Sequence, residues 1–131
     1  VMEHPLIVVR KSKFVLELTT PAGTRIFPVG IGSNPDGGDK EREGDCRTPE
    51  GEFRVVSIED SSEWEHEGER AYGPLFLRLD CPSWDGIGIH GTNEPELVGT
   101  RSSRGCIRMR NDDLLTVAGE VTVGTRVRIV R

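Results

Sequence analysis

Short apolar runs rich in β-branched residues, each closed by turn-forming residues, constrain this fold more than any other feature of the sequence. Short runs bounded by Gly, Pro, Asp or Ser are typical of strands. The segments 10–12 and 20–23, which separate the first runs, suit chain reversal, so we expect antiparallel hairpins there. The strand-like runs cover residues 6–9, 13–18, 25–29, 51–58, 75–79, 86–90 and 125–130.

These runs predict a mainly β fold: an antiparallel β-sandwich or meander with one or two short helices. The later runs are expected either to extend the first sheet or to form a second sheet packed on it. The clearest helix signal covers residues 111–119, where Asn or Asp can cap the first turn, acidic residues follow, and a glycine ends the run. A length of 131 residues predicts a single domain spanning residues 1–131.

The charge of the chain narrows the classes of partner. A formal net charge of −5 disfavours broad electrostatic binding to nucleic acid or to an anionic membrane. No apolar stretch approaches the ~20 residues that a spanning helix needs, so we do not expect the chain as given to cross a membrane. The first residues lack the features of a signal peptide, and because the chain begins with Val1, any export signal is expected to lie outside this sequence.

Two polar stretches interrupt the strand pattern, residues 32–44 and residues 59–73. Both are longer than tight turns. Loops of this length in a small β domain are often binding loops or lids, and plain solvated excursions are about as common. Both interpretations stay open for each loop.

The residues that carry chemistry are concentrated between positions 87 and 110. His90 ends an alternating Gly-Ile strand, and Gly105 directly before Cys106 lets other atoms approach the thiol. Four nearby arginines and the start of the predicted helix should favour the thiolate, and His90 can take the thiol proton. Backbone N–H groups around Gly105 and Cys106 could supply an oxyanion site. The four arginines are Arg101, Arg104, Arg108 and Arg110.

The residues around this pair are more specific than the pair itself, for which a buried structural cysteine beside an edge histidine is the alternative. The segment His90-Gly91-Thr92-Asn93 and the segment from Ser103 to Met109, with fifteen residues between His90 and Cys106, closely resemble the signature of the L,D-transpeptidase catalytic (YkuD) domain family, which includes proteins of the ErfK, YbiS, YcfS and YnhG type. The resemblance extends over nearly the whole chain. Its further segments are Pro28–Gly32, Arg47–Phe53, Tyr72–Pro74 and Gly124–Val127.

The resemblance implies an enzyme that acts on peptidoglycan. Cys106 would attack the L-to-D bond after the third residue of a tetrapeptide stem and release the terminal D-Ala. The side-chain amine of a diamino acid on a second stem would then resolve the thioester and form a 3-3 cross-link, while water would give L,D-carboxypeptidase activity. The resemblance implies that His90 is the catalytic histidine and that the Gly91 carbonyl orients its imidazole.

The same resemblance implies roles for the neighbouring residues. Ser103, Gly105 and Arg108 would line the motif, and Tyr72 would either help the oxyanion site or simply pack. Many family members have His at the position of Arg104, and some have Asn at that of Arg108. A guanidinium at either position fits a free carboxylate of a diaminopimelate-containing stem, and a solvated or ion-paired arginine is the alternative.

Alternative functions of the same site are hydrolysis of a bond between peptidoglycan and a protein, or non-catalytic peptidoglycan binding. We expect no cofactor and no metal site, peptidoglycan stem peptides as partners, a monomer, and, from the resemblance, a place in the bacterial periplasm or cell envelope. The resemblance also predicts that a carbapenem acylates Cys106. Cys46 stands where we expect a glycine, and Cys46 and Cys81 either form a disulfide or stay unpaired.

Overall fold

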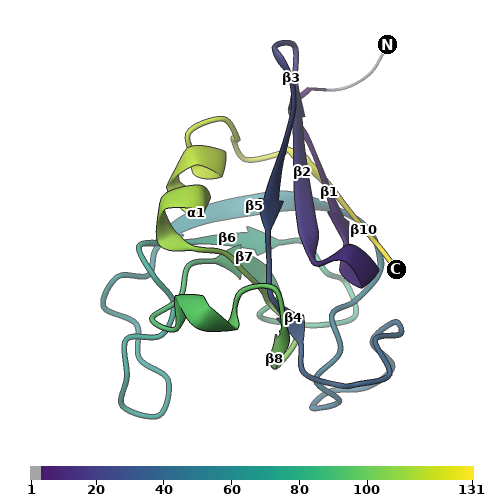
Figure 1. The fold of residues 1–131 in the computed structure, drawn as a ribbon, viewed down its shortest axis with the longest axis vertical. Coiled ribbons are helices and arrows are strands. Elements are labelled where there is room, and N and C mark those ends of the chain that lie inside the picture. The colour runs from purple at the N-terminus through teal and green to yellow at the C-terminus, as the bar shows by residue number, and fades with distance from the viewer. Residues whose placement is uncertain (1–3) are drawn as a thin grey trace.

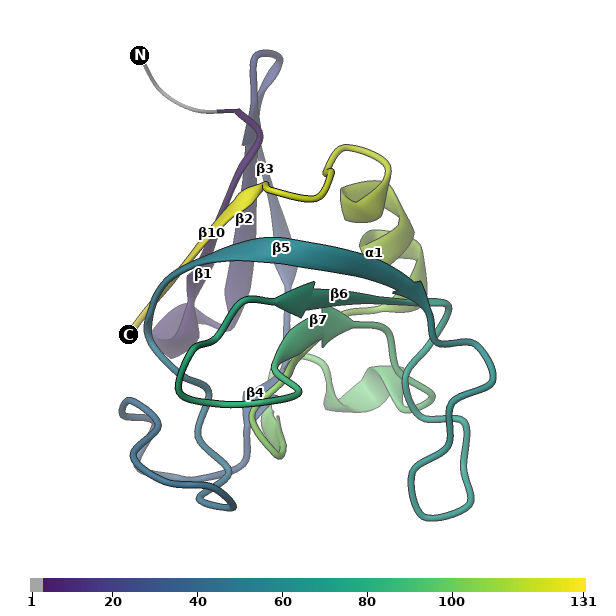
Figure 2. The same ribbon diagram turned by 180° about the vertical axis from the view of Figure 1, so that it is seen from behind.

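The computed structural model of the chain describes residues 4–131. Its main element is an eight-stranded sheet in the order β3-β2-β1-β10-β5-β6-β7-β9, and β4 and β8 form a second, two-stranded sheet (Figures 1 and 2). The strands are β1 Leu6–Arg10, β2 Val15–Thr20, β3 Gly23–Pro28, β4 Ile31–Gly32, β5 Gly51–Asp60, β6 Leu75–Leu79, β7 Gly88–His90, β8 Arg101–Ser103, β9 Ile107–Arg108 and β10 Arg126–Val130. The helices are α1 Asn111–Ala118 and the 3₁₀ turns η1 Lys11–Lys13 and η2 Pro95–Leu97.

The prediction of a mainly β fold with short helices is confirmed, and the later runs extend the first sheet. The strand pairs are not all antiparallel, because β10 lies parallel to β1 and β9 lies parallel to β7. A parallel neighbour requires a crossover connection of about a dozen residues or more. Residues 91–106, between β7 and β9, provide such a connection.

The large sheet curls around one apolar core. Strand β5 has ten residues and crosses the molecule above β6 (Figure 2), and its register with β6 shifts between Val55 and Ser57. Such an irregularity bends a strand and increases its twist. Ile7, Leu77 and Ile89, from three different strands, are fully buried in the core.

Helix α1 lies against the strands that carry His90 and its neighbours. Leu114 and Val117 of α1 are fully buried in the same core. The expected side-chain cap is absent from this helix, because Arg110 is the N-cap residue and makes no side-chain capping bond. The Oδ1 atom of Asn111 instead accepts a hydrogen bond from the Thr92 backbone N–H at 2.9 Å. Asn111 therefore ties the start of α1 to the segment after His90.

The turn between β1 and β2 contains a lysine that composition would place in solvent. Lys11 is 2% exposed, and its ammonium group donates to the carbonyl oxygens of Gly38 (2.9 Å) and Thr48 (2.8 Å) and pairs with Glu50 at 2.9 Å. This lysine anchors the polar stretch 32–44 to the sheet. Within residues 4–131, no helix is long and apolar enough to cross a membrane.

Candidate active site

His90 is the last residue of β7 and is 3% exposed. Its ring stacks on Phe76 with centroids 5.4 Å apart, and the ring of Tyr72 lies 5.1 Å away. The Nδ1 atom is 2.5 Å from the Gly91 carbonyl oxygen. Because a carbonyl oxygen only accepts hydrogen bonds, Nδ1 carries the proton and Nε2 is left to act as a base.

Burial lowers the pKa of His90 from 6.5 to about 4. The positive charge of Arg108 also lowers it, while hydrogen bonds to the backbone carbonyls of Gly91 and Tyr72 act in the opposite direction. The imidazole is therefore neutral at physiological pH and able to take a proton.

The position of Gly91 requires a residue without a side chain. A Cβ atom at Gly91 would overlap Asn111 Oδ1 and would lie 3.0 Å from both Gly73 Cα and Pro74 Cδ. Gly73, on the other side of this contact, has a φ of +67°, and it too has no room for a Cβ atom. This packing fixes the carbonyl group that orients the imidazole.

Cys106 lies directly before β9. The parallel register pairs Ile89 with Ile107 and His90 with Arg108, which places Cys106 beside the start of β7. The Cys106 thiol donates to the Gly86 carbonyl oxygen at 3.2 Å. The crossover after His90 thus returns the chain to a neighbouring strand and brings the thiol to the part of the sheet that holds the imidazole.

Burial raises the pKa of the Cys106 thiol. A hydrogen bond from the Gly88 backbone and the charges of Arg108, Arg78 and Lys40 lower it, but they do not outweigh the loss of hydration. The expectation that clustered arginines make the resting thiol a thiolate is therefore wrong. A protonated thiol needs a base before it can attack.

Two of the four neighbouring arginines point away from the thiol. The Arg101 guanidinium lies over the Phe14 ring at 5.2 Å, and Arg104, with its side chain 73% exposed, pairs with Glu67 of the loop 59–73 at 3.2 Å. Arg108 is half-buried, and its Nε atom is buried without a hydrogen-bond partner among the described residues.

Ser103 and Gly105 shape the turn that presents Cys106. The buried Ser103 hydroxyl donates to the Cys106 carbonyl oxygen at 2.6 Å and accepts from the Gly105 N–H at 3.1 Å. Gly105 has a φ of +144°, and a Cβ atom there would lie 3.0 Å from the Arg47 carbonyl oxygen. Both residues support the backbone of Cys106, and their contact with substrate stays a prediction.

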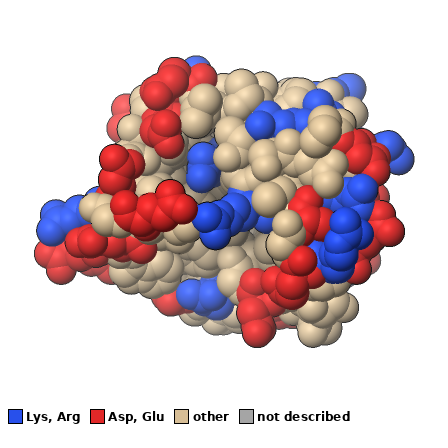
Figure 3. All heavy atoms as spheres, turned by 90° about the horizontal axis from the view of Figure 1, so that it is seen from below, with Lys and Arg blue, Asp and Glu red and all other residues tan. Residues whose placement is uncertain are grey.

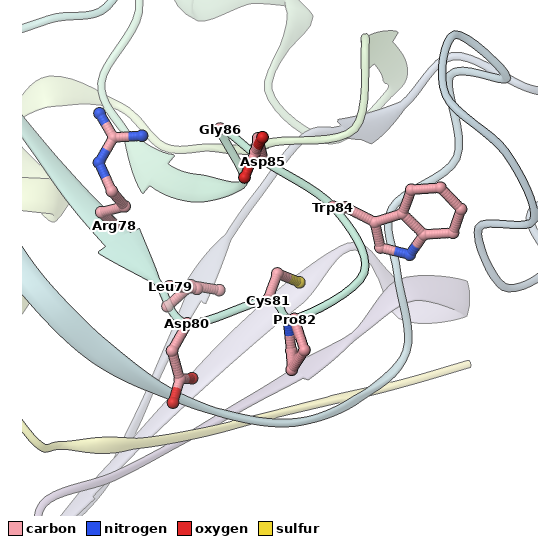
Figure 4. Close-up of a pocket in the computed structure, with 8 residues that line it drawn as sticks. All are labelled: Arg78, Leu79, Asp80, Cys81, Pro82, Trp84, Asp85 and Gly86. Atoms are coloured by element: carbon pink, nitrogen blue, oxygen red, sulfur yellow. The ribbon is translucent and has the colours of Figure 1, made fainter.

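Two pockets meet at Gly86, the residue whose carbonyl accepts the hydrogen bond of the Cys106 thiol. One, of about 470 Å³, is drawn in Figure 4, where the Arg78 guanidinium and the Trp84 ring lie at opposite ends with Cys81 between them. The other, of about 410 Å³, has an aromatic wall that includes Tyr72. Both pockets include Arg78 and Gly86, and Gly86 accepts the hydrogen bond of the Cys106 thiol. The aromatic wall consists of Trp64, Tyr72 and Phe76.

The polar stretch 32–44 leads into a rigid support beside this site. Lys40 pairs with Asp45 at 2.9 Å, and both side chains are almost fully buried. Burial alone would raise the pKa of Asp45, but the backbone N–H of Glu41, the Lys40 ammonium and two further backbone N–H groups hold it well below its usual range. The Lys40 ammonium also lies 5.4 Å from the centre of the Trp84 ring.

The remaining cysteines take no part in this arrangement. Cys46 and Cys81 are both free thiols, so the disulfide alternative is not realised in this structure. Cys46 has a φ of +57°, a conformation that favours glycine, which agrees with the glycine expected at this position. Among residues 4–131 there is no group of three or more His, Cys, Asp or Glu side chains that could hold a metal ion.

The face that includes the loops is shown in Figure 3, where basic side chains near the middle have acidic side chains on either side.

A family model described as L,D-transpeptidase catalytic domain (YkuD) matches residues 4–129 of this sequence. The chain belongs to the L,D-transpeptidase family. This finding confirms the resemblance found in the His90 and Cys106 segments.

Curated relatives support this membership. YqjB of Bacillus subtilis, named as an L,D-transpeptidase, is 42% identical over 93 residues, which cover 65% of this chain and 53% of YqjB. YkuD of Bacillus licheniformis is 42% identical over 83 residues, which cover 63% of this chain and 45% of that protein. The chain thus spans about half the length of these relatives.

Solved structures show that the fold is shared. An L,D-transpeptidase from Mycobacterium smegmatis superposes with a TM-score of 0.72 at 19% identity, covering 96% of this chain and 58% of that one. The L,D-transpeptidase LdtMt1 in complex with imipenem gives a TM-score of 0.69 at 21% identity, covering 95% of this chain and 58% of that one. The transpeptidase fold therefore persists here at low sequence identity.

Several residues around the L,D-transpeptidase motif were missed by sequence reasoning. Arg78 and Lys40 act on the charge of Cys106, Phe76 stacks on His90, and Asn111 fixes the segment after His90. The alternating pattern of β6 could have placed Phe76 and Arg78 on one face of a strand. Nothing in the sequence shows that this strand lies beside the one that ends at His90.

Proposed function

We propose that this chain is a peptidoglycan L,D-transpeptidase in which Cys106 is the nucleophile, His90 is the general base and the Gly91 carbonyl orients the imidazole. The observation that supports this best is that the parallel pairing of β7 and β9 places Cys106, directly before β9, beside the strand that ends at His90, within the range that matches the transpeptidase family. The reaction that we propose is acyl transfer from a tetrapeptide stem to a diamino-acid amine, which makes a 3-3 cross-link.

In the first step, His90 Nε2 takes the thiol proton as the sulfur attacks the carbonyl carbon after the third stem residue. The C–N bond breaks, the proton passes from His90 to the leaving amine, and D-Ala departs from a thioester on Cys106. Backbone N–H groups near Gly105 and Cys106 stabilise the oxyanion. The acceptor amine then attacks the thioester, His90 takes its proton, and the C–S bond breaks to return the thiol.

The charge states of the two side chains fit this sequence of proton transfers. The thiol has a raised pKa and the imidazole a lowered one, so the neutral pair is the resting form. A neutral pair avoids two buried charges before substrate arrives. The proton then moves only when a carbonyl carbon is present to receive the sulfur.

The test incubates the purified chain with disaccharide-tetrapeptide muropeptides and identifies the products by mass spectrometry. We expect cross-linked dimers from the wild type and none from Cys106→Ala, with the two proteins melting at similar temperatures. Cys46→Ala is the matched control, because it removes another half-buried free thiol that lies outside the motif around Cys106. Dimers formed by Cys106→Ala would disprove the proposed nucleophile.

A β-lactam provides a second readout of the same site. One relative is solved with imipenem and another with a faropenem-derived adduct. We propose that a carbapenem acylates Cys106 here, seen as a mass increase that is lost in Cys106→Ala and kept in Cys46→Ala.

The products distinguish the alternatives that use this site. Tripeptide monomers without dimers indicate L,D-carboxypeptidase activity, in which water resolves the thioester. Release of a peptidoglycan-linked protein indicates a hydrolase of that bond. Binding of stem peptides with neither product nor covalent adduct indicates a non-catalytic module.

The setting of the activity is part of the proposal. We propose that residues 1–131 act as one catalytic domain and a monomer, with stem peptides as partners and no nucleic acid, in the bacterial periplasm or cell envelope. Family membership and the negative formal charge support this setting. We further propose Arg104, Arg108 and Tyr72 as substrate or oxyanion contacts; of these, the position of Tyr72 beside His90 in the aromatic pocket supports a contact best.

A further inference from the structure

We propose that Arg78 binds a free carboxylate of the stem peptide and makes this chain select free-acid stems over amidated ones. The inference rests on the proposed function and names a specificity residue for it. Arg78 lies on β6 and is half-buried. It is the one basic residue among the described residues that line the two pockets beside Cys106, and it lines both.

One edge of the Arg78 guanidinium is held in place. Nε donates to Glu59 Oε2 at 2.6 Å and Nη2 donates to Glu59 Oε1 at 3.2 Å. The Ser57 hydroxyl, on the residue opposite Arg78 in the sheet, donates to the same Glu59 carboxylate at 2.6 Å. The neighbouring strand therefore fixes the orientation of the guanidinium before any ligand binds.

The other edge of the guanidinium is open. No group within residues 4–131 accepts a hydrogen bond from Nη1. The guanidinium carbon lies 4.9 Å from the centre of the Phe76 ring, and that ring stacks on His90. The open Nη1–Nη2 edge is thus held in a fixed relation to the proposed catalytic base, close enough that its charge acts on the Cys106 thiol.

An open guanidinium edge selects for a carboxylate. A carboxylate offers two oxygens that accept two parallel N–H bonds, whereas a carboxamide offers one oxygen and turns an NH₂ group toward the arginine donors. A diaminopimelate-containing stem carries free carboxylates near the bond that Cys106 would attack. Arg104 is less suited to this role, because it pairs with Glu67 on the surface.

The experiment measures binding apart from turnover. Cys106→Ala protein is titrated by calorimetry with two synthetic tetrapeptide stems that differ only in having carboxylates or carboxamides on their side chains. We expect the free-acid stem to bind about tenfold or more tightly, and Arg78→Gln on the same background to lose most of that preference with little effect on the amide stem. Arg78→Lys should keep part of the preference, because it keeps the charge but not the fork.

Arg128→Gln is the matched control, because it removes an arginine that is paired with a glutamate, Glu52, in the same sheet but lines neither pocket. It should leave the preference unchanged. Equal binding of both stems, binding of neither, or an equal loss for both stems in Arg78→Gln would overturn the proposal. Turnover with Cys106 intact is assayed separately, so a selective protein without transpeptidase products contradicts the proposed function and leaves the role of Arg78 supported.

Discussion

At the scale of single residues, the position of the imidazole depends on the absence of a Cβ atom at Gly91. His90 holds its proton on Nδ1 because Nδ1–H donates a hydrogen bond to the Gly91 carbonyl oxygen, and that carbonyl is fixed because Gly91 has no side chain to collide with Asn111. The chemical capacity of His90 therefore depends on a glycine and an amide that never contact the substrate in the proposed reaction.

Gly91→Ala should test this dependence. The added methyl overlaps Asn111 Oδ1, so we expect a loss of about 1–3 kcal/mol in unfolding free energy and a fall in kcat of more than about tenfold. Denaturant titration and muropeptide turnover measure the two effects. Gly119→Ala is the control, because a Cβ there meets only ordinary contacts at 3.5 Å. Unchanged turnover in Gly91→Ala would show that the carbonyl does not need this packing.

The candidate site was partly predictable at this scale. His90, Gly91, Ser103, Gly105 and Cys106 were found because their types and spacing form a local motif. Arg78 and Lys40 were not, because they reach the thiol from strands and loops far away in the sequence. The charge state of Cys106 was mispredicted for a related reason, since the number of nearby arginines says nothing about how far the thiol is desolvated.

At the scale of elements, the polar stretch 32–44 beside the site is held by a buried lysine in the turn between β1 and β2. Lys11 of η1 holds the backbone at Gly38 and Thr48, and the Lys40–Asp45 pair closes the next part of the loop. Both lysines look like surface residues in the sequence. Their burial follows from carbonyl and carboxylate partners that only the folded chain brings to them.

Lys11→Met should reveal the role of this anchor. The change leaves two carbonyl oxygens and the Glu50 carboxylate without their buried cation, so we expect a loss of about 3 kcal/mol in unfolding free energy. Lys13→Met, in the same turn but exposed, should change stability by less than about 0.5 kcal/mol. A small effect of Lys11→Met would mean that water replaces the ammonium group at little cost.

The elements that sequence reasoning missed are the short ones. Strands β4, β8 and β9 each have only two or three residues, which is too short for an alternating pattern to be recognised. The other seven strands were all found, including the three-residue β7, because their apolar residues face one core. Helix α1 was located correctly, but the Asn111 side chain accepts a hydrogen bond from the segment after His90 instead of capping the helix.

At the scale of the whole molecule, the free energy of unfolding should fall in two stages as the pH is lowered. Burial lowers the pKa of His90 from 6.5 to about 4, so the unfolded chain binds a proton more readily than the folded one in that range. Unfolding free energy should therefore fall as the pH drops from about 6.5 to about 4, by about 3 kcal/mol. Asp45, whose pKa is depressed, stabilises the fold above the ordinary carboxyl range and adds a second loss as the pH falls below it.

Urea titrations at a series of pH values measure this profile. In His90→Gln, the loss between about pH 6.5 and 4 should be largely absent, while the loss at lower pH persists. Turnover by the wild type should keep its acidic limb near pH 4, because His90 stays neutral above that value. An acidic limb near 6.5 would show that the imidazole is far better hydrated than its burial indicates.

The order of strands in the large sheet has a consequence for how the protein is made. Strand β10 lies between β1 and β5, so it joins the hairpins β1–β3 to the half of the sheet that carries His90 and Cys106. During synthesis β1–β3 leave the ribosome before β5–β9, and β10, which links the two groups, leaves after both. Until β10 has been synthesised, the edges of β1 and β5 that it joins lack that pairing partner. Completion of the sheet therefore depends on β10, and the edges of β1 and β5 are open to wrong pairing until it is in place.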